Sequence, residues 1–429
     1  MVDLCKINYF CALCFPSMRL KRSIEIDRYR YPLPESRIAR YPLPQRDQSS
    51  LLFYNRGTIE KRTFRELPDL LPAGTRLVFN TTRVIQARMH FRKPTGALIE
   101  IFCLEPVMPA DYEQAFQVTG SATWKCLVGN ARKWKEGPVH MDLGSGDQKW
   151  RVTALKEESS PGDFTIRFSW EHPEVTFGEI LEQAGRTPIP PYLNREAEES
   201  DRERYQTIYS RNPGSVAAPT AGLHFTPEMM AKLEEKQIHT SEITLHVGTG
   251  TFVPVKEKDA RMHSMHTERV VIPMDFLSNW SHTPEPFLAV GTTTTRSLES
   301  LYWLGVKMLA GKVAGPDSLR FDQWEYEHLP QQIGLKESLQ AIQRFCQQHG
   351  LKELAFTTRL MIVPGYRFRT IRGLVTNFHM PGSTLLLLIA AFIGEDWRKV
   401  YDFALSNGFR FLSYGDSSLL LPQGWSGTH

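Results

Sequence analysis

Cysteine is scarce in this sequence of 429 residues, and long apolar runs are missing. Three of the six cysteines fall within the first fourteen residues and the others are isolated in apolar stretches: Cys5, Cys11, Cys14, Cys103, Cys126 and Cys346. This spacing does not suit a disulfide framework and indicates a reducing compartment, so we expect a cytoplasmic protein. The apolar stretch from Leu385 to Ile393 is about half as long as a membrane-spanning helix, so no membrane association is predicted.

Several motifs of nucleotide and metal chemistry are also missing. The absence of GxGxxG, and of GxxxxGK followed by Ser or Thr, argues against a dinucleotide or nucleoside triphosphate site. His263, His266 and Glu268 could imitate a metal site, but HExxH is absent and the spacing of the two histidines fits zinc motifs poorly. We therefore predict neither a metal ion nor a cofactor.

The charge balance is mildly basic, with a net charge of +4 and a pI near 8.6. This balance is compatible with a polyanionic partner such as RNA, and equally with a solvated basic surface. The opening residues are too short and too weakly basic for a good signal peptide. We expect residues 1–18 to form a disordered extension.

Two kinds of pattern divide the chain. From Leu77 to Trp170, short β-like runs such as "ALIEIFCLE" and "DFTIRFSW" are punctuated by Gly, Pro and Asp, which is typical of a small antiparallel barrel or sandwich. Elsewhere strands alternate with helices, which favours an α/β layer fold. We therefore predict a mixed α/β layered main domain from residues 19–76 and 171–429, with residues 77–170 inserted as an antiparallel β-barrel.

Local signals place several elements of the main domain. Thr226 is expected to cap a helix that has Pro227 in its first turn. "STLLLLIAAFIG" is apolar all round and is predicted to be a buried helix. A further helix should bury one stripe and stop near Gly408; the stripe is Trp397, Val400, Tyr401 and Ala404.

Five clusters in the main domain share one design, in which a short polar run ends an apolar strand and precedes a helix. They are "PTAGLHFTPE", "TLHVGTGTF", "VGTTTTRSLES", "TNFHMPGST" and "FLSYGDSS". Strand ends that lead into helix N-termini are the usual ligand sites of open α/β sheets. We expect the five to line a single crevice.

Titratable side chains within these clusters are the candidates for chemistry. His224, His246 and His379 each fall in one cluster, and an imidazole titrates near neutral pH. Arg296 is either an anion clamp or the partner of Glu299 one helical turn later. Asp416 is either an acid/base group or a turn residue.

Six stretches taken together resemble the S-adenosylmethionine:tRNA ribosyltransferase-isomerase family of queuosine biosynthesis, and the resemblance runs from Ile24 to Leu421. The stretches are "DRERYQTIYSRNPGSVAAPTAGLHFT", "TLHVGTGTFVPV", "VGTTTTRSLES", "PGYRF", "LVTNFHMPGSTLLLLIAAFIG" and "RFLSYGDSSLL". The resemblance implies a mixed α/β domain with an inserted barrel. It implies transfer and isomerisation of the ribosyl part of S-adenosylmethionine onto 7-aminomethyl-7-deazaguanine at the tRNA wobble position. The products would be epoxyqueuosine, adenine and methionine, with S-adenosylmethionine as co-substrate and no metal.

This resemblance gives the candidate residues expected roles. His224 is the leading candidate for the base, ahead of His379 and His246, and Asp416 is a further catalytic candidate. Contacts to S-adenosylmethionine are expected from Ala218, Pro219, Thr220, Gly222, Thr226, Gly248, Thr293, Arg296, Glu299, Asn377 and Ser383. Contacts to tRNA are expected from Arg202, Arg204, Tyr205 and Arg367, with Arg369 beside them. We expect a monomer.

The sequence also departs from the family pattern. Thr81 stands where the family usually has Asp, and Gln86 where it usually has Pro. Two alternatives therefore stay open: a paralogue with the same S-adenosylmethionine crevice but another acceptor, and a non-catalytic RNA-binding protein.

Overall fold

The structure is a computed structural model, and it describes residues 23–146, 149–160, 163–248, 255–283 and 285–424. The predicted extension at residues 1–18 lies outside the described residues, as do residues 249–254 of the stretch "TLHVGTGTFVPV". In the described ranges no helix combines the length and the apolar character that crossing a bilayer requires.

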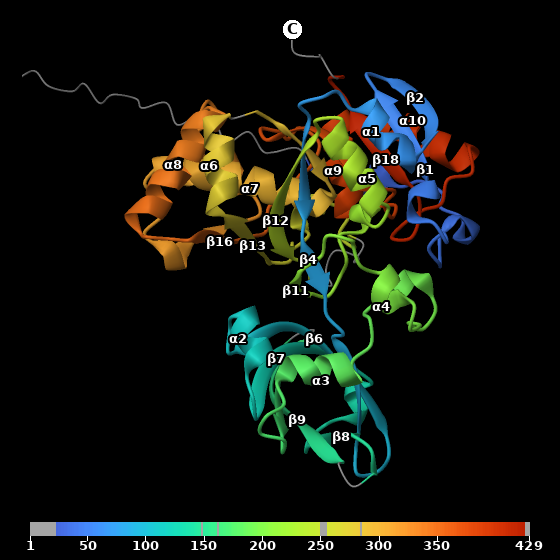
Figure 1. Ribbon diagram of the computed structural model, residues 1–429, viewed down its shortest axis with the longest axis vertical. Coiled ribbons are helices and arrows are strands. Elements are labelled where there is room, and N and C mark those ends of the chain that lie inside the picture. The colour runs from blue at the N-terminus through green and yellow to red at the C-terminus, as the bar shows by residue number, and fades with distance from the viewer. Residues whose placement is uncertain (1–22, 147–148, 161–162, 249–254, 284, 425–429) are drawn as a thin grey trace, which may run out of the picture.

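The main domain is built on a mixed sheet of ten strands, counted in the described residues (Figure 1). From edge to edge these are β15 (Arg320–Phe321), β16 (Glu353–Thr358), β13 (Glu268–Pro273), β12 (His239–His246), β3 (Arg76–Asn80), β14 (Phe287–Val290), β17 (Ile371–Asn377), β18 (Ser417–Leu421), β1 (Ser50–Asn55) and β2 (Thr58–Thr63). The neighbours β12, β3, β14 and β17 run parallel to one another. Their carboxyl ends therefore meet at one edge of the sheet.

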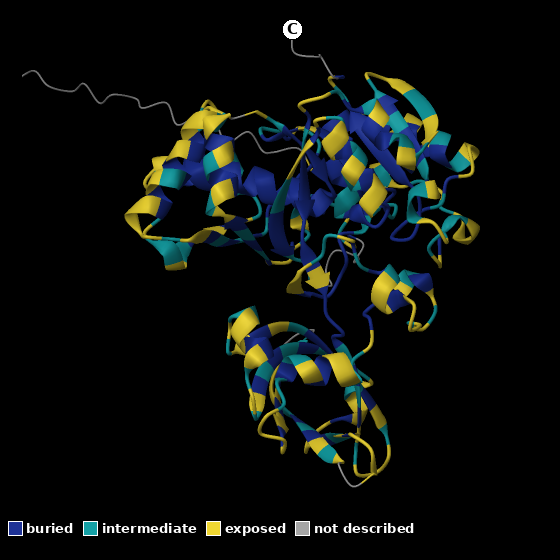
Figure 2. Cartoon of the chain, in the orientation of Figure 1, coloured by how far each residue is buried: buried dark blue, intermediate teal, exposed yellow. Residues whose placement is uncertain are grey.

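Side chains of the central strands are buried on both faces of the sheet, because successive residues of a strand point to opposite sides. Leu77 and Phe79 of β3 pack in a cluster with α1 (Leu67–Leu70) and α5 (Pro227–Glu235). Val78 belongs to a larger cluster to which the remaining large helices contribute. These are α6 (Met274–His282), α7 (Thr292–Leu309), α8 (Leu335–Gln348), α9 (Thr384–Ile393) and α10 (Asp396–Ser406). Figure 2 shows the sheet between the helices as buried.

The second unit is a closed antiparallel barrel with its own core. Its strands follow one another around the barrel as β10 (Asp163–Trp170), β7 (Ser121–Gly129), β6 (Leu98–Met108), β5 (Arg88–Arg92), β8 (Val139–Leu143) and β9 (Trp150–Ser160). Trp124, Phe91 and Phe168 are fully buried inside it. The predicted fold class, a mixed α/β domain with an inserted β-barrel, is thereby confirmed.

The boundaries of the barrel unit differ from the expected 77–170 at both ends. Residues 77–80 belong to β3 in the main sheet, and the first barrel strand begins at Arg88. At the other end α3 (Phe177–Ala184) packs into the barrel core, with the Phe177 ring 5.4 Å from that of Trp124. The chain also forms a short helix within the barrel unit, α2 (Tyr112–Gln117), where no helical period was evident in the sequence.

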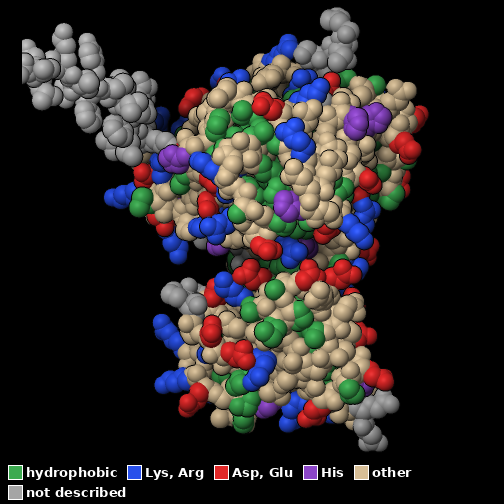
Figure 3. All heavy atoms as spheres, turned by 90° about the vertical axis from the view of Figure 1, so that its left-hand side faces the viewer, with side chains coloured by type: hydrophobic (Ala, Val, Ile, Leu, Met, Phe, Trp, Pro, Cys, Tyr) green, Lys and Arg blue, Asp and Glu red, His purple; other side chains and the backbone are tan. Residues whose placement is uncertain are grey.

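Two neighbouring segments connect the units. The chain leaves β3 through β4 (Thr82–Val84) and returns through α4 (Asp201–Arg204) and β11 (Asn212–Ser215), which pairs with β4. Both connections lie between the sheet and the barrel in Figure 1, and Figure 3 shows a narrower neck there with charged side chains on either side. The barrel is therefore attached at the edge where the parallel strands end.

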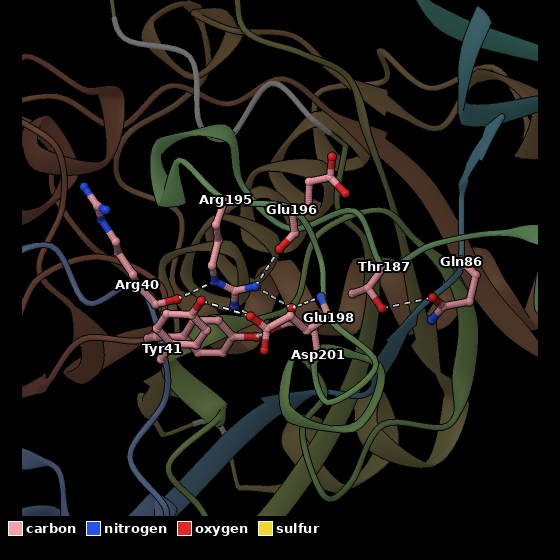
Figure 4. Close-up of polar contacts among 9 residues, drawn as sticks. Arg40, Tyr41, Gln86, Thr187, Arg195, Glu196, Glu198 and Asp201 are labelled. Carbon is pink, nitrogen blue, oxygen red and sulfur yellow. Dashed lines mark hydrogen bonds and ion pairs between the residues drawn. The ribbon is translucent and has the colours of Figure 1, made fainter. Parts of the chain in front are cut away.

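Buried polar contacts fix the point of departure. The Asn80 amide donates to the Leu245 carbonyl (3.1 Å) and its oxygen accepts from the backbone N–H of Thr82 and of Leu245. The Thr81 hydroxyl lies 3.1 Å from that of Thr244. Gln86 accepts a hydrogen bond from the Thr187 hydroxyl in the return segment (2.9 Å; Figure 4). Thr81 and Gln86, the two departures from the family pattern, are thus both hydrogen-bonded.

The return segment is held by a buried ion pair. Arg195 donates to both carboxylate oxygens of Asp201 at 2.7 Å and to the carbonyl of Arg40 (Figure 4). Burial acts to raise the pKa of Asp201, but hydrogen bonds from Arg195, the Glu198 backbone and Tyr414 hold it below its ordinary value. The carboxylate is therefore charged, and it anchors α4 to the main domain.

Local predictions for the main domain are confirmed. Thr226 accepts from the backbone N–H of Met229 and Pro227 opens α5. α9 is buried along its length, and the four residues of the predicted stripe are the buried residues of α10. Gly408 follows the end of α10 with a positive φ of 76°, as a helix stop requires.

The contact between barrel and main domain predicts the effect of Gly214→Ala. The ring of Tyr112 in α2 stacks on His246 of β12 (4.4 Å, 14°) beside Gly214. A Cβ at this position would lie 2.6 Å from His246 Nδ1 and 2.8 Å from the Tyr112 ring, and φ is +138°. We expect the free energy of unfolding to fall by about 1–3 kcal/mol in urea titrations. Gly315→Ala, with nothing within 4 Å of the added Cβ, is the control; an equal effect of both would contradict the prediction.

Candidate active site

A cavity lies at the carboxyl ends of the parallel strands, and we call it the strand-end cavity. It is lined by Tyr192, Ala217, Ala218, Pro219, Thr220, Ala221, Val247, Gly291, Thr292, Thr293, Thr376, Asn377, Phe378, His379, Met380, Ser383, Leu385, Leu412 and Ser413. The lining comes from the ends of β12, β14 and β17 and from segments distant in the sequence. Its lining is mainly apolar with a few polar side chains, which is typical of sites for small organic molecules.

The loop after β11 forms one wall with small side chains. Ser215 ties this loop to β12, since its hydroxyl donates to the Ala217 carbonyl and accepts from the Val247 N–H (2.9 Å each). Thr220 donates to the amide oxygen of Asn377 (2.9 Å), and the Asn377 Nδ2 is buried without a partner. The cavity wall thus holds an unused donor that a ligand could engage.

Two helices begin at this cavity. α7 starts directly after Gly291, and α9 starts after Ser383, whose hydroxyl accepts from the Leu386 N–H (3.2 Å). Thr293 lies in the first turn of α7 and lines the cavity. N-terminal N–H groups and the helix dipole favour an anionic group at such positions.

His379 is the only histidine among the described residues that lines the cavity. Its Nε2 lies 3.3 Å from the Thr376 hydroxyl and its Nδ1 3.4 Å from that of Tyr401, while Tyr31 donates to its carbonyl. Burial lowers the pKa of His379 to about 3. The ring is therefore neutral at physiological pH.

His246 and His224 lie outside the strand-end cavity. His246 is stacked on Tyr112 at the contact with the barrel, and its pKa falls to about 4 through burial and the charge of Arg269. His224 faces a second cavity, which we call the His224 cavity, and its Nδ1 lies 2.9 Å from the Ser49 hydroxyl. The structure therefore separates the leading sequence candidate from the crevice that it was expected to serve.

Arg296 and Glu299 have structural partners and do not line the strand-end cavity. The Arg296 guanidinium is buried, pairs with Glu268 of β13 (2.9 Å) and donates to the Leu360 carbonyl. Glu299 accepts from the Tyr366 hydroxyl and from the backbone of Arg369 and Thr370. Neither the clamp nor the mutual pair expected from the sequence is formed.

Four further predicted site residues take structural positions. Asp416 accepts from the backbone of Ser50 and Arg410 and pairs with the Arg410 side chain (3.3 Å). Thr226 caps α5, Gly222 lies against the Tyr209 hydroxyl, and Gly248 follows the cavity wall without lining it. None of these four residues lines the strand-end cavity.

The residues expected to contact tRNA are spread over three places. Arg202 is exposed beside the neck and Arg204 lines the His224 cavity, whereas Tyr205 is fully buried against Tyr414. Arg367 is exposed and Arg369 packs on Tyr302 and Trp303. Both lie just before β17, at its amino end and therefore away from the strand-end cavity. The buried position of Tyr205 excludes it as a surface contact.

Sequence reasoning missed several lining residues. Tyr192 and Ser413 share a short hydrogen bond between their hydroxyls, and Thr376, Leu412 and Met380 complete the wall. The cluster "FLSYGDSS" lines the cavity with Leu412 and Ser413 and not with the aspartate predicted from the sequence. Among the described residues no group of three or more His, Cys, Asp or Glu side chains is placed to hold a metal ion.

Comparison with known proteins identifies the family. The family model of the queuosine biosynthesis proteins matches residues 26–420. A protein of Trichlorobacter lovleyi named S-adenosylmethionine:tRNA ribosyltransferase-isomerase is 37% identical over 403 residues, 92% of this chain and 99% of its own length. Proteins of the same name from Syntrophomonas wolfei (37% identical; 92% and 97% covered) and Acaryochloris marina (35%; 95% and 96%) are similarly related.

A solved structure, the S-adenosylmethionine tRNA ribosyltransferase of Thermotoga maritima, is 28% identical, covers 92% of this chain and 99% of its own, and has a TM-score of 0.42. The shared name of the relatives is that of a transferase-isomerase, so the class of protein is an enzyme. The chain belongs to the queuosine biosynthesis family of S-adenosylmethionine:tRNA ribosyltransferase-isomerases, which confirms the resemblance noted in its sequence.

The buried Arg296–Glu268 pair predicts a large loss of stability on Arg296→Met. Removing the guanidinium leaves the Glu268 carboxylate, 2% exposed, without this countercharge. We expect the free energy of unfolding, measured in urea, to fall by about 3–5 kcal/mol. Arg62→Met, at the more exposed Arg62–Glu60 pair, should change it by less than about 1 kcal/mol. The double variant Arg296→Met with Glu268→Met should recover much of the loss, and its failure to do so would count against the pair.

The buried histidines predict a loss of stability in mild acid. The pKa values of His224, His246 and His379 fall to about 4, 4 and 3 in the folded protein. In the unfolded chain they lie near 6.5, so unfolding takes up protons between about pH 6.5 and pH 4. Each ring should therefore lower the free energy of unfolding by about 2 kcal/mol between about pH 7 and pH 5.

Urea titrations at both pH values measure this loss. Between pH 7 and pH 5 the free energy of unfolding of His379→Gln should decrease less than that of the wild type. The difference should be about 2 kcal/mol, the contribution of one histidine ring. The control is His239→Gln at an exposed position of β12. An identical pH dependence in wild type and His379→Gln would refute the assignment of a neutral buried ring.

Proposed function

We propose that the protein transfers and isomerises the ribosyl part of S-adenosylmethionine onto 7-aminomethyl-7-deazaguanine at the wobble position of tRNA. The products are epoxyqueuosine in the tRNA, adenine and methionine. The observation that supports this reading is the strand-end cavity, which combines small-residue walls, two helix N-termini and a neutral imidazole. The names of the relatives supply the class of substrates.

The lining of the cavity suits S-adenosylmethionine. Ala217, Ala218 and Pro219 present little side-chain bulk, so backbone can approach a nucleoside closely. The N-terminus of α7 at Thr293 is a favourable place for the methionine carboxylate, in place of the Arg296 clamp expected from the sequence. Asn377 Nδ2, buried without a partner, would then gain an acceptor from the ligand.

His379 is the side chain we assign as the base. The reaction requires removal of a proton next to the sulfonium, departure of adenine and attack by the aminomethyl nitrogen. A positioned imidazole is a common general base, and His379 is the histidine of the described residues that lines the cavity. Burial keeps the ring uncharged but lowers its pKa to about 3, so the base role requires that bound substrates raise this pKa. Thr376 and Tyr401 hold its two ring nitrogens within 3.4 Å.

The assay incubates the protein with S-adenosylmethionine and tRNA that carries the deazaguanine precursor. Adenine release and a mass gain on the tRNA are expected. Adenine without modified tRNA would indicate a paralogue with another acceptor, and RNA binding without either product would indicate a binding protein. Each of these outcomes would overturn the proposal.

His379→Gln should lower kcat by about 10²–10⁴-fold, which is the usual contribution of general base catalysis. Glutamine keeps hydrogen-bonding capacity but cannot accept the proton, so binding of S-adenosylmethionine should change little. His239→Gln serves as the matched control. A His379→Gln enzyme with nearly normal kcat would remove the assignment while leaving the overall reaction intact.

A further inference from the structure

The His224 cavity is a second site with no role in the steps described above. It is a small hollow lined by Pro42, Leu43, Arg46, Ser49, Arg204, Leu223, His224, Arg410, Ser413 and Tyr414. These residues come from the N-terminal segment, from α4, from the start of the α5 region and from the loop before β18. Three arginines thus converge on one hollow.

The positive charge of this cavity is only partly neutralised. In the described residues Arg46 and Arg204 have no carboxylate within ion-pair distance, while Arg410 pairs with Asp416. Burial lowers the pKa of Arg46, and the nearby charge of Arg204 lowers it further, an effect that the exposed Glu203 partly offsets. Guanidinium groups held close together in this way favour an anion between them.

The guanidiniums also retain unused donors. Arg46 donates to the carbonyls of Gln206, Leu223 and Glu203, and Arg204 donates to those of Leu43 and Pro44. A guanidinium has five N–H groups. Arg46 uses three of them in these contacts, and Arg204 uses two. The Arg204 Nε is buried and has no partner, so backbone contacts position the side chains and leave N–H groups for a ligand.

His224 contributes an imidazole to the lining of the cavity. The side chain is 5% exposed, its Nδ1 is held by Ser49, and its Nε2 is buried with no hydrogen bond to the described residues. Burial lowers the pKa of the ring, while the Arg46 backbone lies close enough to raise this pKa in part. If Ser49 donates to Nδ1, the neutral ring carries its proton on Nε2 and donates from there. A phosphate oxygen is the acceptor that both an imidazole N–H and a guanidinium prefer.

Buried polar contacts hold the walls of the cavity. α4, which carries Arg204, is anchored by the Arg195–Asp201 pair (Figure 4). Tyr414 donates to the same carboxylate (2.7 Å). Ser413 lines both this cavity and the strand-end cavity. A group bound at His224 would therefore lie next to the ligand of the strand-end cavity.

We propose that the His224 cavity binds one backbone phosphate of the RNA, adjacent to the nucleotide that enters the strand-end cavity. This inference rests on the proposed function, because it takes the RNA as the substrate. Arg46, Arg204 and Arg410 neutralise the phosphate, and His224 Nε2 donates to one of its oxygens. His224 is then a binding residue, not the base.

The test is a cycle between protein variants and RNA backbone changes. Binding of the precursor anticodon stem-loop is measured by fluorescence anisotropy without S-adenosylmethionine, with a neutral methylphosphonate placed at one loop phosphate at a time. At one position the change should weaken binding to wild type about tenfold. In Arg46→Gln the same methylphosphonate should weaken RNA binding less than about twofold. The slope of log affinity against log salt concentration should also be smaller in this variant, by about the contribution of one phosphate contact.

His224→Gln provides a second variant that keeps all three guanidiniums, and it too should reduce the penalty. Arg372→Gln, exposed at the amino end of β17, should leave it unchanged. A penalty that is equal in wild type, Arg46→Gln and His224→Gln would overturn the inference. Competition by inorganic phosphate together with the predicted coupling would support it, whereas phosphate binding without coupling would mark a site for a free anion and overturn it.

The outcome is separable from that of the proposed function. Adenine release by the wild type is measured on the unmodified phosphate backbone and does not depend on the cycle. Modification of tRNA without coupling at any loop phosphate would overturn only the phosphate site. Coupling without adenine release would overturn only the ribosyl transfer.

Discussion

The parallel alignment of β12, β3, β14 and β17 is the constraint on which the rest of the molecule depends. It brings four carboxyl ends to one edge of the sheet, and the segment that follows each strand takes a different course there. β14 and β17 lead toward helices and line the strand-end cavity, β12 carries His246 to the neck, and β3 continues into the barrel. The ligand site and the attachment of the second unit are therefore consequences of the same alignment.

Buried polar groups around this edge keep the loops in place. The amide of Asn80 donates to and accepts from β12, and it also accepts from the first residue of β4. Glu299 holds the loop before β17, and Asp201 holds the segment that returns from the barrel. Each would destabilise the fold if left without its partners. Their common effect is to define the directions in which neighbouring segments leave the sheet.

The sequence predicted elements whose signals are local. Thr226 caps α5 through a contact within one helical turn, and the buried stripe of α10 shows in the sequence as a helical period; both predictions are confirmed. The barrel boundary at residue 77 was wrong because Leu77 and Phe79 were taken as alternate positions of a barrel strand. β3 is instead buried on both faces and pairs with β12 and β14 in the main sheet. Likewise, the polar strand ends predicted the edge of the site but not which loop face each side chain would occupy. His379 turns into the strand-end cavity, whereas His224 and Arg296 turn away from it toward partners that are distant in the sequence.

The distribution of charge adds a physical reason why the arginines lie outside the strand-end cavity. No Lys, Arg, Asp or Glu among the described residues lines the strand-end cavity, and its imidazole is neutral. Such a lining does not repel a sulfonium, which a guanidinium inside the cavity would do at close range in a poorly screened site. The guanidiniums gather instead around His224, on the other side of Ser413, where a polyanion would benefit from them. A reaction that brings a cationic donor to an anionic acceptor needs both environments within reach of one another, and the loop of Leu412 and Ser413 keeps them adjacent yet apart.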